Sequence, residues 1–208
     1  MNTPIRILLA DDHPSLRAGL ASILNAQPDL TVVAEAGSGS ETLTQFQASH
    51  PDILLIDLRM PDGDGIQTIK DLIARDPEVK TLVLTTYDNE EDIFSALEAG
   101  ARGYILKDTT REEIIEAVRQ VHAGQRFLPP AIASRLADRM IRPTLTPREL
   151  DVLRLVSRGR SNKDMAAAMF LSEETIKSHM KGLFQKLGVH DRAEAVAIAL
   201  QRGLLRMD

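Results

Sequence analysis

Five short apolar runs, each followed by a longer amphipathic segment, constrain the fold of this chain more than any other feature. Continuous apolar runs are typical of strands buried on both faces of a parallel sheet. The runs occupy residues 5–10, 30–36, 53–56, 81–84 and 103–106. Helical spacing of apolar residues predicts helices at 15–25, 40–49, 66–75, 90–99 and 110–123. This alternation predicts a doubly wound α/β domain around a five-stranded parallel sheet.

A second pattern follows Gly124, where Pro129 and Pro130 end the alternation. We expect residues 128–143 to form a linker that is partly helical, with the helix at 131–140. Beyond it, Thr146 and Glu149 have the spacing of a capping box, which opens the first of several helices. The others are expected at 162–170, from 172 to about 188, and from 192 to about 202. The chain is therefore expected to hold an α/β domain at 1–127, the linker, and a small all-α domain at 144–208.

Charge separates the same two modules. Residues 1–130 carry eleven Lys and Arg against 21 Asp and Glu, whereas residues 131–208 carry 14 against nine. The basic excess suits a polyanionic partner, although a solvated surface explains it equally well. The absence of cysteine excludes disulfides, thiol catalysis and cysteine-bound zinc. No apolar stretch approaches the ~18 residues of a membrane span, and the N-terminus shows no signal-peptide pattern, so we expect a cytoplasmic protein without membrane contact.

Charged and polar side chains follow four of the five predicted strands. Asp11 and Asp12 follow the first strand, Asp57 the third, Thr85 the fourth and Lys107 the fifth. In an open parallel sheet, ligands bind at the carboxyl ends of the strands. Three carboxylates gathered there repel by several kcal/mol at an effective dielectric of about 20.

A cation at this edge would offset the repulsion. Aspartate oxygens favour Mg²⁺, and an aspartate can attack phosphorus to form an aspartyl phosphate. Helix capping is the alternative for any one of these residues, and Asp12 in particular could cap a helix that begins near Pro14. The five histidines show no metal-ligand spacing, and His13 is expected to be a surface or capping neighbour.

Residues from about 4 to 124 resemble the receiver domain of two-component response regulators, which has a flavodoxin-like fold. The resemblance rests on ADDH at 10–13, LIDLRMPDGDG at 55–65, LTT at 84–86 and AGARGYILK at 99–107. It implies that Asp57 accepts a phosphoryl group from a sensor histidine kinase. It further implies a Mg²⁺ ion held by Asp11, Asp12, Asp57 and the backbone carbonyl of Arg59. Lys107 would pair with the phosphoryl group, and Thr85 and Tyr104 would form the switch pair.

Two positions depart from the receiver pattern. Asp108 stands where many receivers have proline, which leaves the backbone after Lys107 open. Thr86 stands where a smaller residue is frequent, and it narrows the expected entrance to Asp57.

Residues 172–188 divide their helix into two faces. Ile176, Met180, Leu183 and Leu187 form a buried stripe, whereas Lys177, Ser178, Lys181 and Gln185 lie on another face. A recognition helix needs this division, because apolar residues anchor it while donors enter the major groove. A surface helix with solvated lysines has the same spacing.

Residues 144–203 resemble the LuxR-type helix-turn-helix domain. The motifs are LTPRELDVL at 145–153, NKDMA at 162–166, LSEETIKSH at 171–179 and KLGV at 186–189. The resemblance implies contacts with double-stranded DNA, at bases or in the groove, from Lys177, Ser178 and Lys181. Phosphate-backbone contacts or support are implied for Asn162, Lys163, Thr175 and His179. Together, the two resemblances indicate the NarL/FixJ class of transcription regulators.

The last predicted helix is apolar almost all round. Such a helix buries more than one side. We expect one side to pack on its own domain and Ala195, Ile198 and Ala199 to contact a second copy, as a homodimer formed on phosphorylation. A well-packed terminal helix with spare alanines is the alternative.

The sequence thus predicts a phosphorylation-activated transcription regulator that is not an enzyme. The nearest alternative is a regulator that binds DNA without phosphorylation. A phosphatase with an aspartate nucleophile is disfavoured, because Arg59 stands where such an enzyme has a second aspartate. An RNA-binding output domain is disfavoured by the motif at 175–181.

Overall fold

The computed structural model describes residues 3–61 and 63–205 of the chain. The chain divides into two compact units, one at residues 1–88 and 92–134 and the other at 89–91 and 135–208. The division falls inside helix α6 (Pro130–Ile141), which lies within the predicted linker. The ends of the two predicted domains, at residues 1–2 and 206–208, lie outside the described residues, as does Asp62 of the motif at 55–65.

The first unit is built on the predicted five-stranded parallel sheet. Its strands have the order β2-β1-β3-β6-β7, so the chain starts next to one edge, adds β2 at that edge, and then continues through β3 toward the other edge. They span Ile5–Ala10 (β1), Leu30–Ala36 (β2), Ile53–Ile56 (β3), Lys80–Thr85 (β6) and Gly103–Leu106 (β7). All neighbouring pairs in this sheet are parallel, which confirms the doubly wound fold.

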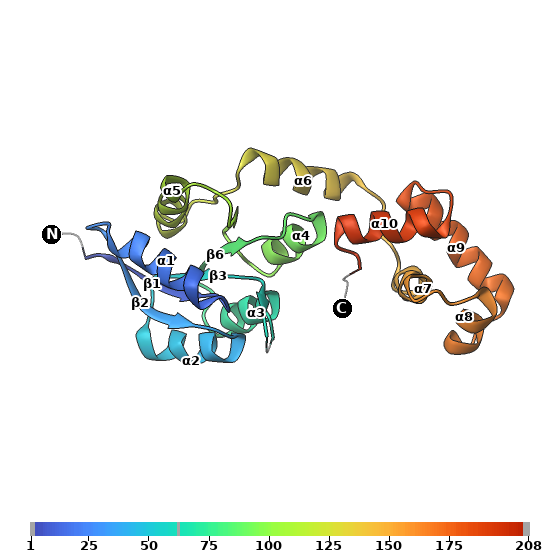
Figure 1. Cartoon of the computed structure of the whole chain (residues 1–208), viewed down its shortest axis with the longest axis horizontal. Helices are drawn as coiled ribbons and strands as arrows, with labels where there is room; N and C mark the ends of the chain where they lie inside the picture. The colour runs from blue at the N-terminus through green and yellow to red at the C-terminus, as the bar shows by residue number, and fades with distance from the viewer. Residues whose placement is uncertain (1–2, 62, 206–208) are drawn as a thin grey trace. The chain divides into compact units, whose positions relative to one another are not determined.

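Helices cover both faces of this sheet (Figure 1). They are α1 (Pro14–Asn25), α2 (Gly39–Ser49), α3 (Gly65–Arg75), α4 (Glu90–Glu98) and α5 (Arg111–His122). Leu20 and Leu24 of α1 join Ile114 and Val118 of α5 in one core cluster against the sheet. Consecutive residues of the central strands are buried, as in Leu54 and Leu55 of β3, which explains why the strands read as unbroken apolar runs.

A short hairpin follows β3 and was not predicted. Strand β4 (Arg59–Met60) pairs antiparallel with β5 (Gly63–Asp64), directly after Asp57. Each strand has only two residues, too few for an alternating pattern to appear in the sequence.

Gly65 brings the start of α3 against the backbone of this hairpin. Its N–H donates to the carbonyl of Leu58 at 3.0 Å. A Cβ atom at this position would lie 2.4 Å from the carbonyl oxygen of Asp57 and 2.8 Å from the Cα of Leu58. Because both atoms belong to the backbone, they cannot move aside as a flexible side chain would, and the site requires glycine.

The second unit contains four helices after α6. They are α7 (Pro147–Ser157), α8 (Asn162–Met169), α9 (Glu173–Leu187) and α10 (Arg192–Arg202). Thr146 and Glu149 form the predicted capping box of α7, and Ser161 and Asp164 form a second one on α8. Helix α8 ends at Phe170, and α9 begins after Ser172, so a tight turn joins them as a helix-turn-helix.

The second unit encloses its own hydrophobic core. Ile176, Met180, Leu183 and Leu187 of α9 are all buried in it, as the stripe predicted. Ala195 and Ala199 of α10 are also fully buried in this core, so the prediction that they contact a second copy is wrong. Ile198 is half-buried and packs against the same cluster. A helix that is apolar nearly all round does not reveal from its sequence which side faces inward.

We expect Gly65→Ala to destabilise the first unit by about 1–3 kcal/mol, because the added methyl group displaces backbone. Both tyrosines of the chain, Tyr87 and Tyr104, lie in this unit, so tyrosine fluorescence during urea unfolding reports on it. Gly19→Ala in α1 is the matched control, since a Cβ there meets nothing within 4 Å. The control should raise stability by about 0.5–1 kcal/mol through helix propensity. Equal effects of the two substitutions would contradict the close approach at Gly65.

Candidate functional site

An acidic pocket lies at the carboxyl ends of β1 and β3. Asp11 is 1 % and Asp57 4 % exposed. The backbone N–H of Asp57 donates to the carbonyl of Ala10 at 2.9 Å, which fixes the end of β3 beside the end of β1. One possible ligand atom from each of Asp11, Asp12, His13 and Asp57 lies within 4.8 Å of the others. The structure thus brings together the three carboxylates that the sequence predicted at this edge.

Lys107 reaches into this pocket from the end of β7. Its Nζ lies 2.5 Å from Oδ2 of Asp57 and 2.7 Å from Oδ2 of Asp11. Burial disfavours the charged form of this lysine, but hydrogen bonds to Asp11 and Asp57 outweigh burial and raise its pKa above the ordinary value. The ammonium group is therefore charged at neutral pH. The peptide bond to Asp108 is trans, so the missing proline does not displace Lys107 from the pocket.

The residues of the pocket fit a divalent cation. Three carboxylates and one ammonium leave a net charge of about −2, which a divalent ion balances, and oxygen ligands suit a hard cation such as Mg²⁺. Asp12 is the most open of the three, with 27 % of its side chain exposed. The backbone N–H of Arg59 donates to Oδ1 of Asp57 at 3.3 Å, which places the backbone of Arg59 beside this carboxylate. Its carbonyl as a ligand stays a prediction.

His13 is an exposed residue at the N-cap of α1, as expected, and it also lies beside the carboxylates of the pocket. Its Nδ1 lies 2.7 Å from Oδ1 of Asp12 and 3.3 Å from Oδ1 of Asp11. His13 is the N-cap residue of α1, and no side-chain cap bond is formed there, so Asp12 does not serve as the helix cap. Metal-ligand spacing did not identify His13 in the sequence, because its partners are Asp11 and Asp12, which directly precede it, rather than residues one helical turn away.

Thr85 and Tyr104, the predicted switch pair, are both fully buried. The hydroxyl of Tyr104 donates to the carbonyl of Tyr87 at 2.6 Å, and the N–H of Tyr87 donates to Oγ1 of Thr85 at 3.5 Å. Burial raises the pKa of Tyr104, and the carboxylates of Asp92 and Asp88 raise it further. The tyrosine side chain therefore points inward in this structure, which carries no phosphoryl group. Thr86 is exposed at the end of β6.

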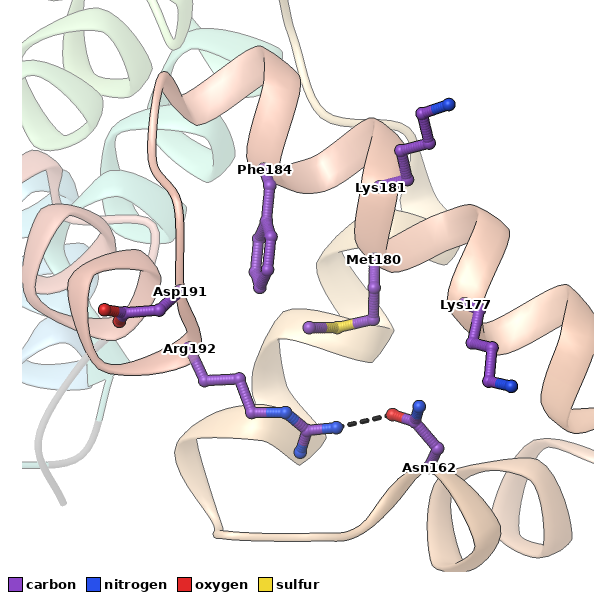
Figure 2. Close-up of a pocket in the computed structure, with 7 residues that line it drawn as sticks. All are labelled: Asn162, Lys177, Met180, Lys181, Phe184, Asp191 and Arg192. Atoms are coloured by element: carbon purple, nitrogen blue, oxygen red, sulfur yellow. Dashed lines mark hydrogen bonds between the residues drawn. The ribbon is translucent and has the colours of Figure 1, made fainter.

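Helix α9 presents the predicted polar face on the second unit. Lys177, Ser178 and Lys181 are exposed, and so is Lys163 on α8. Three other predicted residues are half-buried: Asn162, Thr175 and His179. This position suits support of the helix or contact with a DNA phosphate backbone more than insertion into a DNA groove. Figure 2 shows Lys177 and Lys181 along this helix, with their side chains extending away from it in different directions.

Lys177 and Lys181 also line a pocket of about 470 Å³, across which Arg192 extends toward Asn162 (Figure 2). Its Nη2 donates to Oδ1 of Asn162 at 2.5 Å, and its Nη1 donates to the carbonyl of Arg160 at 2.8 Å. Arg192 thereby ties the start of α10 to the start of α8. Sequence reasoning missed this residue, because its partners lie some 30 positions earlier and no local spacing connects them.

A salt bridge holds the C-terminal end of α9. Lys186 lies 2.7 Å from Oε2 of Glu149, whose side chain also caps α7 through Thr146. Burial opposes ionisation of Glu149, but hydrogen bonds from Lys186 and Thr146 hold its pKa below the ordinary value. Gly182 permits this approach, since a Cβ there would lie 2.7 Å from Oε1 of Glu149.

The fold and the two sites define a class of protein: an α/β domain with an acidic pocket, joined to a helix-turn-helix domain. Comparison with known families agrees. The response regulator receiver domain matches residues 7–119, and the family of bacterial regulatory proteins of the luxR family matches residues 143–199.

Individual relatives match over nearly the whole chain. The transcriptional regulatory protein YhcZ of Bacillus subtilis is 42 % identical over 96 % of this chain and 97 % of its own. The DNA-binding transcriptional activator DevR/DosR of Mycobacterium tuberculosis is 38 % identical, over 95 % of this chain and 94 % of its own. The chain belongs to the NarL/LuxR family of response regulators, and it is a two-component transcription regulator with a DNA-binding helix-turn-helix domain.

Solved structures show the same architecture. The response regulator ChrA of a heme-sensing two-component system is 41 % identical, covers 98 % of this chain and 100 % of its own, and has a TM-score of 0.59. RcsB of Salmonella enterica serovar Typhimurium, solved on promoter DNA with the phosphomimetic BeF₃⁻, is 26 % identical. It covers 97 % of this chain and 100 % of its own, with a TM-score of 0.75.

Among residues 3–61 and 63–205, none of the helices combines the length and apolar character that crossing a bilayer requires.

Proposed function

We propose that a sensor histidine kinase transfers a phosphoryl group to Asp57, and that this transfer activates the protein as a transcription regulator. The observation that carries the proposal is the position of Lys107, whose Nζ contacts both Asp57 and Asp11 in a pocket of net charge near −2. A buried ammonium between two carboxylates is arranged to balance further negative charge at Asp57.

In the transfer, a carboxylate oxygen of Asp57 attacks the phosphorus atom of a phosphohistidine. The P–N bond breaks, and its electron pair leaves with the imidazole nitrogen. Asp11, Asp12, Asp57 and the Arg59 carbonyl are proposed to hold Mg²⁺, which neutralises phosphoryl oxygens when bound. Lys107 pairs with a second phosphoryl oxygen, and the Thr85 hydroxyl donates to a third. Because Tyr104 is already inward, the modification acts by holding Thr85 and Tyr104 in place rather than by drawing the ring inward.

We expect Asp57→Asn to take up no label from acetyl phosphate in the presence of Mg²⁺, because the amide is not a nucleophile. Asp12→Asn should take up little, because the cation site loses a carboxylate. Radiolabel retained on the full chain is the measurement. Asp52→Asn is the control, since Asp52 is an exposed carboxylate that precedes β3. Labelling of Asp57→Asn at the wild-type level would contradict the assignment.

The second unit is proposed to bind double-stranded DNA through α9. Lys177, Ser178 and Lys181 are exposed on one side of a helix whose opposite stripe is buried, the arrangement a recognition helix needs. Lys163, Asn162, Thr175 and His179 are proposed to contact or support the phosphate backbone. Because the proposed ligand is chromosomal DNA, we propose that the protein acts in the cytoplasm.

Removal of the exposed lysines should weaken DNA binding without unfolding the chain. A lysine that contacts only phosphate should lower the slope of log K against log salt by about 1 when replaced by alanine. A base contact should instead cost about 1–3 kcal/mol and relax sequence preference. The measurement is binding of Lys177→Ala and Lys181→Ala to an operator fragment across a salt series.

Arg192→Met and Lys70→Ala are the matched variants in that series. Arg192→Met should lower affinity with an unchanged salt slope, because Arg192 acts through Asn162 and Arg160. Lys70 is exposed on α3, in the first unit, and its loss should change neither quantity. Wild-type affinity in both α9 variants would contradict the proposed recognition helix.

A homodimer is proposed to form on phosphorylation through the outer side of α10. With Ala195 and Ala199 buried, the apolar groups on the outer side are Ala193 and Ala197, which are exposed, and Val196 and Leu200, which are half-buried. They line a shallow cavity of about 590 Å³ together with Val156 and Gly159 near the end of α7 and with Arg192. This surface replaces the residues predicted from sequence, and Ile198 is retained only as a flanking contact.

Ala197→Glu should keep the chain monomeric after addition of beryllofluoride, because the charge would be buried in the interface. Sedimentation of wild type and variant, with and without beryllofluoride, is the measurement. Ala168→Glu, the same change at an exposed alanine of α8, should dimerise as wild type does. A dimer of Ala197→Glu as stable as that of wild type would exclude this surface, and DNA binding indifferent to beryllofluoride would favour regulation without phosphorylation.

A further inference from the structure

A second cationic residue, Arg59, has its backbone beside the acidic pocket. Arg59 follows Asp57 by two residues, and its backbone N–H contacts the Asp57 carboxylate. Its side chain extends toward α4, where Nη2 lies 2.7 Å from Oδ2 of Asp92. The guanidinium carbon also lies 4.5 Å from the centre of the Tyr87 ring, within the range of a cation–π contact. Two neighbours therefore hold this guanidinium group.

Asp92 is a charged residue in an unusual place. It is 2 % exposed, and a carboxylate so buried is stable only with a close partner. The Arg59 side chain, at 29 % exposed, supplies the opposite charge. The ordinary explanation is local, because Asp92 lies in the first turn of α4, where an acidic side chain stabilises the helix. That explanation accounts for an acidic residue in this turn but not for its pairing with Arg59.

The charges near Asp57 give the pair a further consequence. Asp11, Asp12, Asp57 and Lys107 together carry about −2, the charge that a divalent cation balances. An unpaired guanidinium on Arg59, whose backbone N–H contacts Asp57, would add a positive charge next to the pocket residues and repel the cation. We propose that Asp92 is a positioning residue for the acidic pocket: it binds Arg59 and cancels its charge, so that the pocket keeps its affinity for a divalent cation. The inference rests on the proposed use of Mg²⁺ at this site.

The same contacts supply a direct readout. The carbonyl of Tyr87, whose ring stacks on Arg59, accepts the hydrogen bond from Tyr104. The chain has no tryptophan and only these two tyrosines, so its intrinsic fluorescence arises beside the Arg59–Asp92 pair. Mg²⁺ titration of the full chain by tyrosine fluorescence, repeated by calorimetry, measures binding without any phosphoryl transfer.

The decisive comparison is between Asp92→Asn and the double variant Asp92→Asn with Arg59→Gln. Asp92→Asn should weaken Mg²⁺ binding by about tenfold, the order expected for one uncompensated unit charge near a divalent ion. The double variant removes both charges and keeps the backbone carbonyl of residue 59, so its affinity should return to within about twofold of wild type. Arg59→Gln alone is unsuitable, because it removes the cationic partner of a buried carboxylate and so changes the stability of α4 as well as the charge near the pocket.

Glu98→Gln is the control, since it removes one exposed carboxylate from the same helix and should leave Mg²⁺ affinity unchanged. Wild-type affinity in Asp92→Asn would overturn the inference. A double variant as weak as Asp92→Asn would also overturn it, because the loss would then come from α4 itself rather than from the charge of Arg59. Absence of Mg²⁺ binding by the wild-type chain would overturn the proposed cation site, and the inference with it.

Discussion

The bond between Lys107 and the two carboxylates of Asp57 and Asp11 is the interaction on which the first unit depends. It joins the ends of β1, β3 and β7, which are separated by as many as 96 positions in the sequence, at one edge of the sheet. Without the ammonium group, three carboxylates would face one another in a largely buried space. The single positive charge of Lys107 only partly balances the three carboxylates. The unit can therefore fold with these carboxylates together, and the pocket still attracts cations.

The second unit holds one helix, α9, in a fixed orientation on its surface. Hydrophobic packing sets the rotation of α9, since its buried stripe leaves only one side for Lys177 and Lys181. Polar ties at neighbouring elements then fix the surroundings of the helix: Arg192 holds the start of α8, and Glu149 holds Lys186 near the end of α9. A long flexible lysine can find a phosphate from many positions, but base recognition demands that its helix be placed to within a fraction of an ångström.

Sequence patterns predicted the strands and the pocket because both depend on local order along the chain. Asp57 follows an apolar run, and a parallel sheet places the ends of such runs together whatever the helices between them do. Arg192 and Asp92 escaped prediction because their partners lie about 30 positions away, at Asn162 and Arg59, without any periodic relation. Ala195 and Ala199 were assigned to the wrong surface because alanine alone does not distinguish a core position from an interface.

Gly65 separates what the fold requires from what the chemistry requires. A side chain at this position would press on the backbone of Asp57 and Leu58 whether or not Asp57 ever carries a phosphoryl group. Lys107 and Asp12, by contrast, serve the charge balance of the pocket. In a relative that does not use phosphoryl transfer, selection for folding would keep the glycine while the charged residues drifted. A receiver domain that keeps the glycine at the position of Gly65 but has lost the charged residues at the positions of Lys107 and Asp12 would therefore be one that folds without the charge balance of this pocket.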